Sequence, residues 1–253
     1  MASQIITSAT NPLIKKLASL QQKKYRAEEN LFLVEGQRHI DGALNAGWKA
    51  EYILSDSDQP YAGTINVTYP LLQKITGRDN AEHIIAAFAP RWTELPKSTK
   101  DTGDKNPLWI GLEAVRDSGN LGTIWRTAHA TQTAGIILIG QTCDPWAPEC
   151  LRASMGSFAN VPISKISVAD FSDWAKSFHG QIIGTHLTAE SKDFRSLDYR
   201  TPTLLLLGGE HAGLSKDLSR ICTQHVKIPM PGGTESLNLS IAASVLMYHA
   251  ILN

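Results

Sequence analysis

The stretch TLLLLGGEHAGLS, Thr203 to Ser215, combines an apolar strand pattern, a glycine-rich loop and the start of a helix. Strands that are apolar at every position are usually covered on both faces, which is typical of parallel strands joined by helices. In such sheets, ligands bind in the loops that follow the carboxyl ends of the strands. The stretch therefore predicts an open α/β fold with a binding site near Gly208, Gly209 and Glu210.

The same alternation of strand and helix runs through residues 108–253 and predicts one α/β domain with a mostly parallel sheet. Its strand patterns are LWIGLEA, GIILIG, VPISKI, QIIGTHL, TLLLLG and HVKIP. Residues 90–107 are polar, rich in proline and without apolar period, so they are predicted to be a linker. Residues 1–89 contain short strand patterns on either side of a helix from Arg38 to Asn45, which suffice for a small α/β domain.

The composition is that of an ordinary globular protein, with 42% hydrophobic residues among 253 and a formal net charge of zero. The sequence has no apolar run long enough to span a bilayer, and its start does not resemble a signal peptide. The three cysteines form no CxxC pair, which favours a reducing cytoplasm. A membrane or secreted protein is therefore not expected.

Positive charge is concentrated near the N-terminus, because residues 1–27 include five basic residues and no acidic one. Such a patch can contact phosphates while the rest of the protein stays neutral, although a solvated helix face is the simpler interpretation. These residues are Lys15, Lys16, Lys23, Lys24 and Arg26.

Three loops that follow strand patterns carry the polar residues of the second domain, namely 113–122, 208–215 and 229–238. They lack the glycine fingerprint of dinucleotide sites, the phosphate loop of nucleotide hydrolases and the serine elbow of hydrolases. The cysteines and histidines also lack zinc-ligand spacing, so no metal is expected. Apolar residues beside flexible backbone instead suit a flat aromatic ligand such as an adenosyl group.

Four blocks, DSGNLGTIWRTA, RASMGSFANVPI, LLLGGEHAGLS and IPMPGGTESLNLSIAAS, together resemble the SpoU (TrmH) family of RNA ribose 2′-O-methyltransferases in the SPOUT superfamily. The block LVEGQRHIDGAL resembles the L30e-like RNA-binding domain that precedes many such catalytic domains. The resemblance implies a SPOUT domain with a C-terminal trefoil knot, S-adenosylmethionine as cofactor, a structured RNA substrate and a homodimer. One departure is Ser118, where the family often has proline.

The resemblance also implies roles for individual residues. Arg126 would hold an RNA phosphate and stabilise charge on the ribose oxygen, because a guanidinium almost never gives up its proton; a surface arginine is the alternative. Asn120 would orient Arg126 or the RNA, or cap its helix, and Glu210 would position the target nucleotide or pair with a cation. The implied catalytic residues are Asn120, Arg126, Glu210, Ser236 and Asn238. The implied cofactor-binding residues are Leu207, Gly208, Ile228 and Leu237.

The C-terminal helical pattern is apolar almost all round. One face is expected to pack within the domain, and it comprises Leu237, Ile241, Val245 and Tyr248. A second face would be covered by a dimer partner or by a deep core, and it comprises Leu239, Ala242, Leu246 and Ala250.

The favoured function is therefore RNA ribose 2′-O-methylation. Ribosomal RNA of the large subunit is preferred to transfer RNA as the substrate, because the L30e-like domain is similar to the ribosomal branch of the family. A non-catalytic RNA-binding SPOUT protein is disfavoured by the intact polar residues. A dinucleotide-dependent oxidoreductase is disfavoured by the missing glycine fingerprint.

Overall fold

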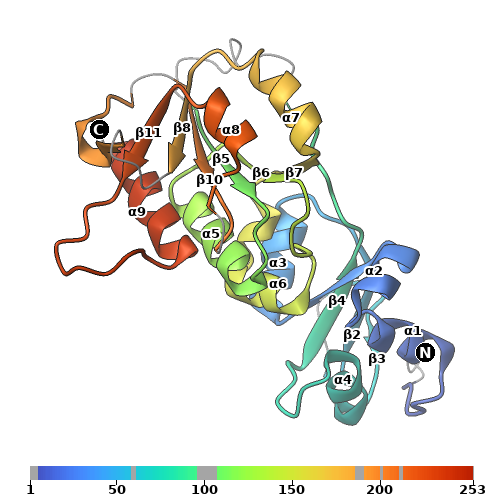
Figure 1. Ribbon diagram of the computed structural model, residues 1–253. Coiled ribbons are helices and arrows are strands. Elements are labelled where there is room, and N and C mark those ends of the chain that lie inside the picture. Colours follow the sequence, from blue (N-terminus) through green and yellow to red (C-terminus); the bar gives the residue numbers. More distant parts are fainter. Residues whose placement is uncertain are drawn as a thin grey trace. The chain divides into compact units, whose positions relative to one another are not determined.

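The structure is a computed structural model, shown in Figure 1. It describes residues 5–57, 61–95, 107–185, 191–199, 202–210 and 213–252. Most of the predicted linker, 96–106, lies outside the described residues. The chain divides into two compact units, each made of two segments. Unit 1 consists of Met1–Arg91 with Asp144–Asn160, and unit 2 consists of Trp92–Cys143 with Val161–Asn253.

Unit 1 is built on a four-stranded sheet in the order β1-β4-β2-β3. Strand β4 pairs antiparallel with β1 and β2, and β3 lies parallel to β2. The strands are β1 (Phe32–Glu35), β2 (Ala50–Ser55), β3 (Ile65–Asn66) and β4 (Ile84–Phe88). The predicted small α/β domain is confirmed, whereas the two-residue strand β3 was not anticipated.

Different helices cover the two faces of this sheet. Helices α1 (Pro12–Ser19) and α4 (Tyr69–Thr76) contribute apolar side chains to a core with Leu33, Leu54 and Ile85. Helix α3 (Gln37–Asn45) contacts β1 and β4. Because side chains alternate along a strand, Phe32 and Val34 of β1 point away from the core that Leu33 joins.

The segment Asp144–Asn160 completes unit 1 although the sequence boundaries place it in the second domain. It carries α6 (Pro148–Ser154) and the short helix η1 (Ser157–Ala159). The Trp146 ring stacks on Phe32 with centroids 4.7 Å apart, and the Trp48 indole donates a hydrogen bond to the Ala159 carbonyl at 3.1 Å. The aromatic side chains of this segment are thus buried against the sheet of unit 1.

Helix α2 (Lys23–Glu29) is tied to the same segment by Arg26. Arg26 is 6% exposed, and its Nε and Nη2 donate to Asp144 Oδ2 at 2.9 and 2.8 Å, while Nη1 donates to the carbonyls of Leu20 and Gln21. Removal of one partner from such a buried pair typically costs about 3–5 kcal/mol. The structure does not support the prediction that Arg26 contacts RNA, because its guanidinium is buried and bound to Asp144 and two backbone carbonyls.

Unit 2 contains a seven-stranded sheet in the order β7-β6-β5-β10-β8-β11-β9, and every neighbouring pair is parallel. The strands are β5 (Leu108–Glu113), β6 (Gly135–Ile139), β7 (Ile163–Ile166), β8 (Gln181–Thr185), β9 (Lys192–Asp193), β10 (Thr203–Leu207) and β11 (Gln224–Lys227). The predicted parallel α/β sheet is confirmed, and the C-terminal knot stays a prediction. Strand β9 was not anticipated because its two residues are charged.

Helices pack on both faces of this sheet (Figure 1). Helices α7 (Val168–Ala175) and α8 (Lys216–Ile221) pack with each other and contribute to a core that includes Ile137 and Ile139 of β6. Helix α9 (Leu239–Leu252) packs on α5 (Ser118–Ala130), β5 and β10. Among the described residues, no helix combines the length and the apolar character needed to cross a membrane.

Helix α9 buries the face opposite to the expected one. Ile241 and Tyr248 are 51% and 46% exposed. The buried residues are Leu239, Ser240, Ala243, Leu246 and Met247. The predicted assignment was wrong because a helix that is apolar all round gives no periodic signal for its inner face. An exposed apolar stripe therefore runs along the helix, and it also includes Ile251 and Leu252.

Candidate active site

Asn120 lies at the centre of a chain of hydrogen bonds that joins the three predicted loops. Its Nδ2 donates to Glu210 Oε1 at 3.1 Å, and its Oδ1 accepts from Asn238 Nδ2 at 2.9 Å. Asn238 Oδ1 accepts from the backbone N–H and the hydroxyl of Ser240, at 2.9 and 2.6 Å. The loops after β5, β10 and β11 therefore meet at one point.

The groups at the two ends of this series of hydrogen bonds determine the orientation of the Asn120 and Asn238 side-chain amides. The backbone N–H of Ser240 can only donate, so Asn238 presents its oxygen to α9 and its NH₂ group to Asn120. An ionised Glu210 can only accept, so Asn120 turns its NH₂ group towards the carboxylate. The two requirements agree, and both side chains are held in a single orientation.

Hydrogen bonds keep Glu210 ionised. Burial alone would raise the pKa of its carboxyl group, but donors from its own backbone, the Asn120 amide and the backbone N–H groups of Arg116 and Asp117 outweigh this and lower the pKa below its usual value. The N–H of Arg116 lies 3.4 Å from Glu210 Oε2. The site thus holds a stable negative charge at neutral pH.

Asp117, rather than Asn120, caps helix α5. The Asp117 carboxylate accepts from the backbone N–H of Asn120 at 2.6 Å, as a residue at this position commonly does. Asn120 is the third residue of the helix, so the alternative that it caps the helix is wrong. Its side chain is 9% exposed and instead links Glu210 with Asn238.

The two described ends of the loop after β10 approach each other closely at Gly208. A β-carbon at Gly208 would lie 1.8 Å from the backbone carbon of Gly213 and 2.1 Å from the nitrogen of Leu214. The N–H of Gly213 donates to the Gly209 carbonyl at 3.0 Å, which joins these two ends. Only glycine permits this approach at position 208, and the close packing sets the backbone wall of the site.

A cavity of about 710 Å³ lies beside this loop and the segment before α9, within the range of small-molecule sites. It brings together the predicted cofactor-binding residues and three of the predicted catalytic ones. Those that line it are Leu207, Gly208, Glu210, Ile228, Ser236, Leu237 and Asn238. Apolar side chains therefore lie beside glycine backbone and the carboxylates of Glu210 and Glu235.

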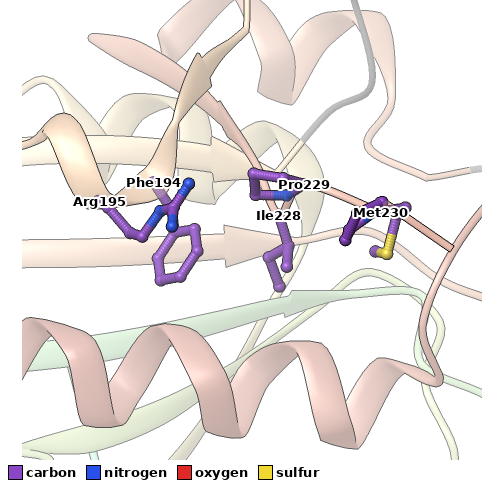
Figure 2. Close-up of a pocket in the computed structure, with 6 residues that line it drawn as sticks. Phe194, Arg195, Ile228, Pro229 and Met230 are labelled. Carbon is purple, nitrogen blue, oxygen red and sulfur yellow. The ribbon is translucent and has the colours of Figure 1, made fainter.

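A second cavity, of about 550 Å³, shares Ile228 and Met230 with the first. Figure 2 shows Phe194 and Arg195 on one side and Ile228, Pro229 and Met230 on the other. Arg195 Nε and Nη2 donate to the Asp193 carboxylate at 2.9 and 2.6 Å and help to lower its pKa to about 2. The segment beginning at Ile228 thus contributes to both cavities.

Arg126 does not line this cavity of its own chain. It lies on α5 six residues after Asn120, which places it about 9 Å further along the helix axis and on a different face. Its side chain is exposed, and none of the described residues binds its guanidinium. The predicted contact of Asn120 or Glu210 with Arg126 is therefore not formed within this chain.

The lysines of the N-terminal helices are partly neutralised. Lys16 Nζ lies 2.7 Å from Glu29, and Lys24 Nζ lies 3.7 Å from Glu28. The hydrogen bond with Glu29 raises the pKa of Lys16. These two glutamates directly follow residues 1–27, which contain no acidic residue. The composition of that segment alone therefore overestimated the unpaired positive charge. Two of the lysines, Lys15 and Lys23, are exposed, and in the described part of the chain neither forms an ion pair.

A buried carboxylate that was not predicted from the sequence lies behind the site. Glu113 ends β5, is 8% exposed, and accepts a hydrogen bond at 2.7 Å from the N–H of Ser215, the residue that caps α8. It thereby anchors the far end of the loop that begins at Gly208. A charged residue at the end of the otherwise apolar pattern LWIGLE was the signal that could have identified it.

The described residues contain no group of three or more histidine, cysteine, aspartate or glutamate side chains placed to hold a metal ion. The site is instead made of amides, the exposed carboxylates of Glu210 and Glu235, and glycine backbone at the carboxyl ends of parallel strands. Such groups can bind and position a ligand. P-loop and metal sites do this with different residues.

Comparison with known proteins identifies both parts of the chain. Residues 107–248 match the SpoU rRNA Methylase family, and residues 11–86 match the MRM3-like substrate binding domain. The 23S rRNA (uridine(2479)-2′-O)-methyltransferase of Streptomyces viridochromogenes is 29% identical over 99% of this chain and 92% of its own. The 23S rRNA (guanosine(2553)-2′-O)-methyltransferase RlmP of Bacillus subtilis is 28% identical over 96% and 98%.

A solved structure gives the same result for the whole fold. An AdoMet-bound rRNA methyltransferase from Sinorhizobium meliloti is 37% identical, with a TM-score of 0.88, over 98% of this chain and 97% of its own. The likeness covers both units and not only the parallel sheet. Together with the family match over more than half of its length, it shows that the chain belongs to the SpoU rRNA methylase family.

Proposed function

We propose that this protein transfers a methyl group from S-adenosylmethionine to a ribose 2′-hydroxyl of ribosomal RNA. One observation carries the proposal: four predicted cofactor-binding residues line the same cavity as Glu210 and Asn238. The names of its full-length relatives, which are 23S rRNA 2′-O-methyltransferases, support the reaction and the substrate class.

The cavity has the chemistry that this cofactor needs. S-adenosylmethionine supplies a methyl group on a positively charged sulfur when it is bound. Leu207, Ile228 and Leu237 offer apolar surface to an adenine ring, and Gly208 lines the cavity without a side chain of its own. The ionised Glu210 favours a positive charge in the cavity, and the AdoMet-bound relative supports this assignment.

Methyl transfer from sulfur to oxygen needs mainly alignment and exclusion of water. In this proposal the hydrogen-bonded pair Asn120 and Asn238 fixes the loops that shape the cavity. Ser236, which lines it, offers a hydroxyl to a bound group. Arg126 holds a phosphate of the RNA and stabilises negative charge on the ribose oxygen.

The position of Arg126 favours a site completed by a second copy of the chain. Its guanidinium is exposed and has no partner among the described residues, as expected if its ligands lie outside this chain. The apolar stripe on α9 supplies a surface for such a homodimer, since exposed apolar patches commonly mark interfaces. The cytoplasmic location stays a prediction from the cysteine pattern.

Ribosomal RNA is preferred to transfer RNA because the ribosomal enzymes match both units of this chain over nearly its full length. The test is transfer of tritium from labelled S-adenosylmethionine to purified large-subunit RNA and, separately, to transfer RNA. We expect label only in the former, at a ribose. Label in transfer RNA alone would reverse the substrate assignment, and cofactor binding without label in any RNA would favour a binding protein without catalysis.

A further inference from the structure

Unit 1 contains a cavity of about 270 Å³ that the proposed methyl transfer does not use. It is lined by residues from β1, α3, α6 and the turns that follow them. The apolar residues that line it are Leu33, whose side chain joins the core on the other face of the sheet, and Val34, Pro148, Leu151, Met155 and Phe158. Its polar groups are Glu35, His39, Arg78, Glu82 and Arg152.

Two arginines are held beside this cavity by one buried carboxylate. Glu35, whose side chain is 9% exposed, accepts from Nη1 of Arg78 at 3.3 Å and from Nη1 of Arg152 at 3.4 Å. The two arginine side chains are 41% and 39% exposed. Arg152 Nη2 also lies 3.9 Å from Glu149 Oε1. A guanidinium has five N–H donors, so each arginine still keeps donors for a ligand while Glu35 holds its position.

Met155 is held at the cavity in a backbone conformation that glycine prefers. It ends α6 at φ +50°, and Gly156 follows at φ +84°. A β-carbon at Gly156 would lie 3.2 Å from Cδ2 of His39, so the turn passes close to the imidazole. Left-handed backbone is uncommon for methionine, yet here it keeps a long apolar side chain 49% exposed.

We propose that this cavity binds one unpaired nucleobase of the RNA substrate, with Arg78 and Arg152 contacting the adjoining phosphates. A base has apolar faces and polar edges, which fits apolar walls next to His39 and Glu82. The cavity is slightly below the usual 300 Å³ of small-molecule sites, and so suits a single base better than a base pair. The inference rests on the proposed function for its RNA, but uses residues of unit 1 only.

Methionine methyl groups allow the two sites to be observed separately. The chain has four methionines, of which Met155 lines this cavity, Met230 lines the proposed cofactor cavity and Met247 is buried in α9. In the full chain labelled with ¹³C at the methionine methyls, we would titrate four RNA hairpins that differ only in one bulged base. A fifth hairpin lacks the bulge, and S-adenosylmethionine is added in a separate titration.

We expect at least one bulged hairpin to shift the Met155 resonance saturably, with roughly tenfold weaker binding of the fully paired hairpin, as stacking of one base commonly gives. The inference would be overturned if none of the five hairpins shifted the Met155 resonance, or if the paired hairpin shifted it as much as the bulged ones. S-adenosylmethionine should shift Met230 alone. Failure of that shift would count against the proposed cofactor site and leave the nucleobase site standing.

Met155→Gly tests the cavity without weakening the fold, because glycine relieves the left-handed backbone at this position. We expect roughly five- to tenfold weaker binding of the preferred bulged hairpin and unchanged binding of the paired one. Gln132→Gly is the control: Gln132 also has positive φ, at +52°, and directly follows Thr131, the C-cap residue of α5 in unit 2. Equal affinity of the Met155→Gly variant and the unmodified protein would refute the site.

Discussion

The side chains of Asn120 and Glu210, 90 residues apart in the sequence, are joined by a hydrogen bond of 3.1 Å. This bond links the start of α5 to the loop after β10, and Asn238 extends the link to α9. The Asn120 side chain thus connects α5, the loop after β10 and α9, which surround the proposed methyl-transfer site. Because the carboxylate can only accept, the charge on Glu210 is part of what holds these elements in place.

Glu210→Gln should therefore change how stability depends on pH. The pKa of Glu210 in the fold lies below its ordinary value of about 4.3. Its contribution to stability is then fully present above that value and is lost as the pH falls through the lower, folded pKa. We expect a constant difference in the free energy of unfolding between the two proteins from pH 8 to about 5, and a shrinking one below about 4.3. Urea unfolding at each pH measures it, and a difference that persists unchanged to pH 3 would contradict this role.

Arg126→Ala should abolish methyl transfer and leave the affinity for S-adenosylmethionine nearly unchanged. Arg126 does not line the cavity, so its loss removes charge stabilisation and not cofactor contacts. We expect kcat to fall by about 10²-fold or more. Arg220→Ala, which removes an exposed arginine of α8, is the control and should keep full activity. Full turnover by the Arg126 variant would remove this residue from the mechanism.

The fold and the approximate location of the site could be predicted because each depends on local sequence patterns. Uninterrupted apolar strands predict a parallel sheet, and glycine- and amide-rich loops mark the carboxyl ends of β5 and β10. The strand order was not predictable in this way, because it is set by long-range pairing. The role of Asp117 as the cap of α5 was missed because Asn120 has an equally suitable side chain.

Other predictions from the sequence were not supported because contacts between residues far apart in the sequence determine the structure there. Arg26 belongs to a basic run, and only its contact with Asp144, 118 residues away, shows that it is structural. Aromatic residues of Asp144–Asn160 pack in unit 1, which no local pattern indicates. The inner face of α9 depends on its packing against α5, since the helix itself is apolar on every side.

Gly208→Ala should prevent cofactor binding. The added methyl group would lie 1.8 Å from the backbone of Gly213, so the loop that shapes the cavity must open. We expect at least about tenfold weaker binding of S-adenosylmethionine by calorimetry, since a displaced backbone wall leaves the ligand's polar groups poorly paired. Gly232→Ala is the control in the opposite loop, where a β-carbon meets nothing within 4 Å. Equal affinity of the Gly208 variant would show that this loop does not form the binding wall.

Tyr248→Asp should dissociate the proposed homodimer. Tyr248 is 46% exposed on the apolar stripe of α9, and a buried, unpaired carboxylate at an interface is costly. We expect a monomer by sedimentation at micromolar concentration, with the fold intact by circular dichroism. Ile5→Asp places the same charge on an exposed apolar residue of unit 1 and should leave the dimer unaffected. A dimer that persists in the Tyr248 variant would exclude this face of α9 as the interface.

Replacement of Lys15 and Lys23 by Gln should weaken RNA binding and flatten its dependence on salt. Of the four predicted lysines, these two are exposed and are not paired with Glu28 or Glu29. Each phosphate contact contributes about 0.7–0.9 to the slope of log K against log salt, so loss of two should reduce the slope by about 1.4–1.8. Lys176 and Lys216 of unit 2, replaced together by Gln, control for the change in net charge. An unchanged slope in the Lys15 and Lys23 variant would mean that the N-terminal helices carry solvated charge and do not contact the RNA.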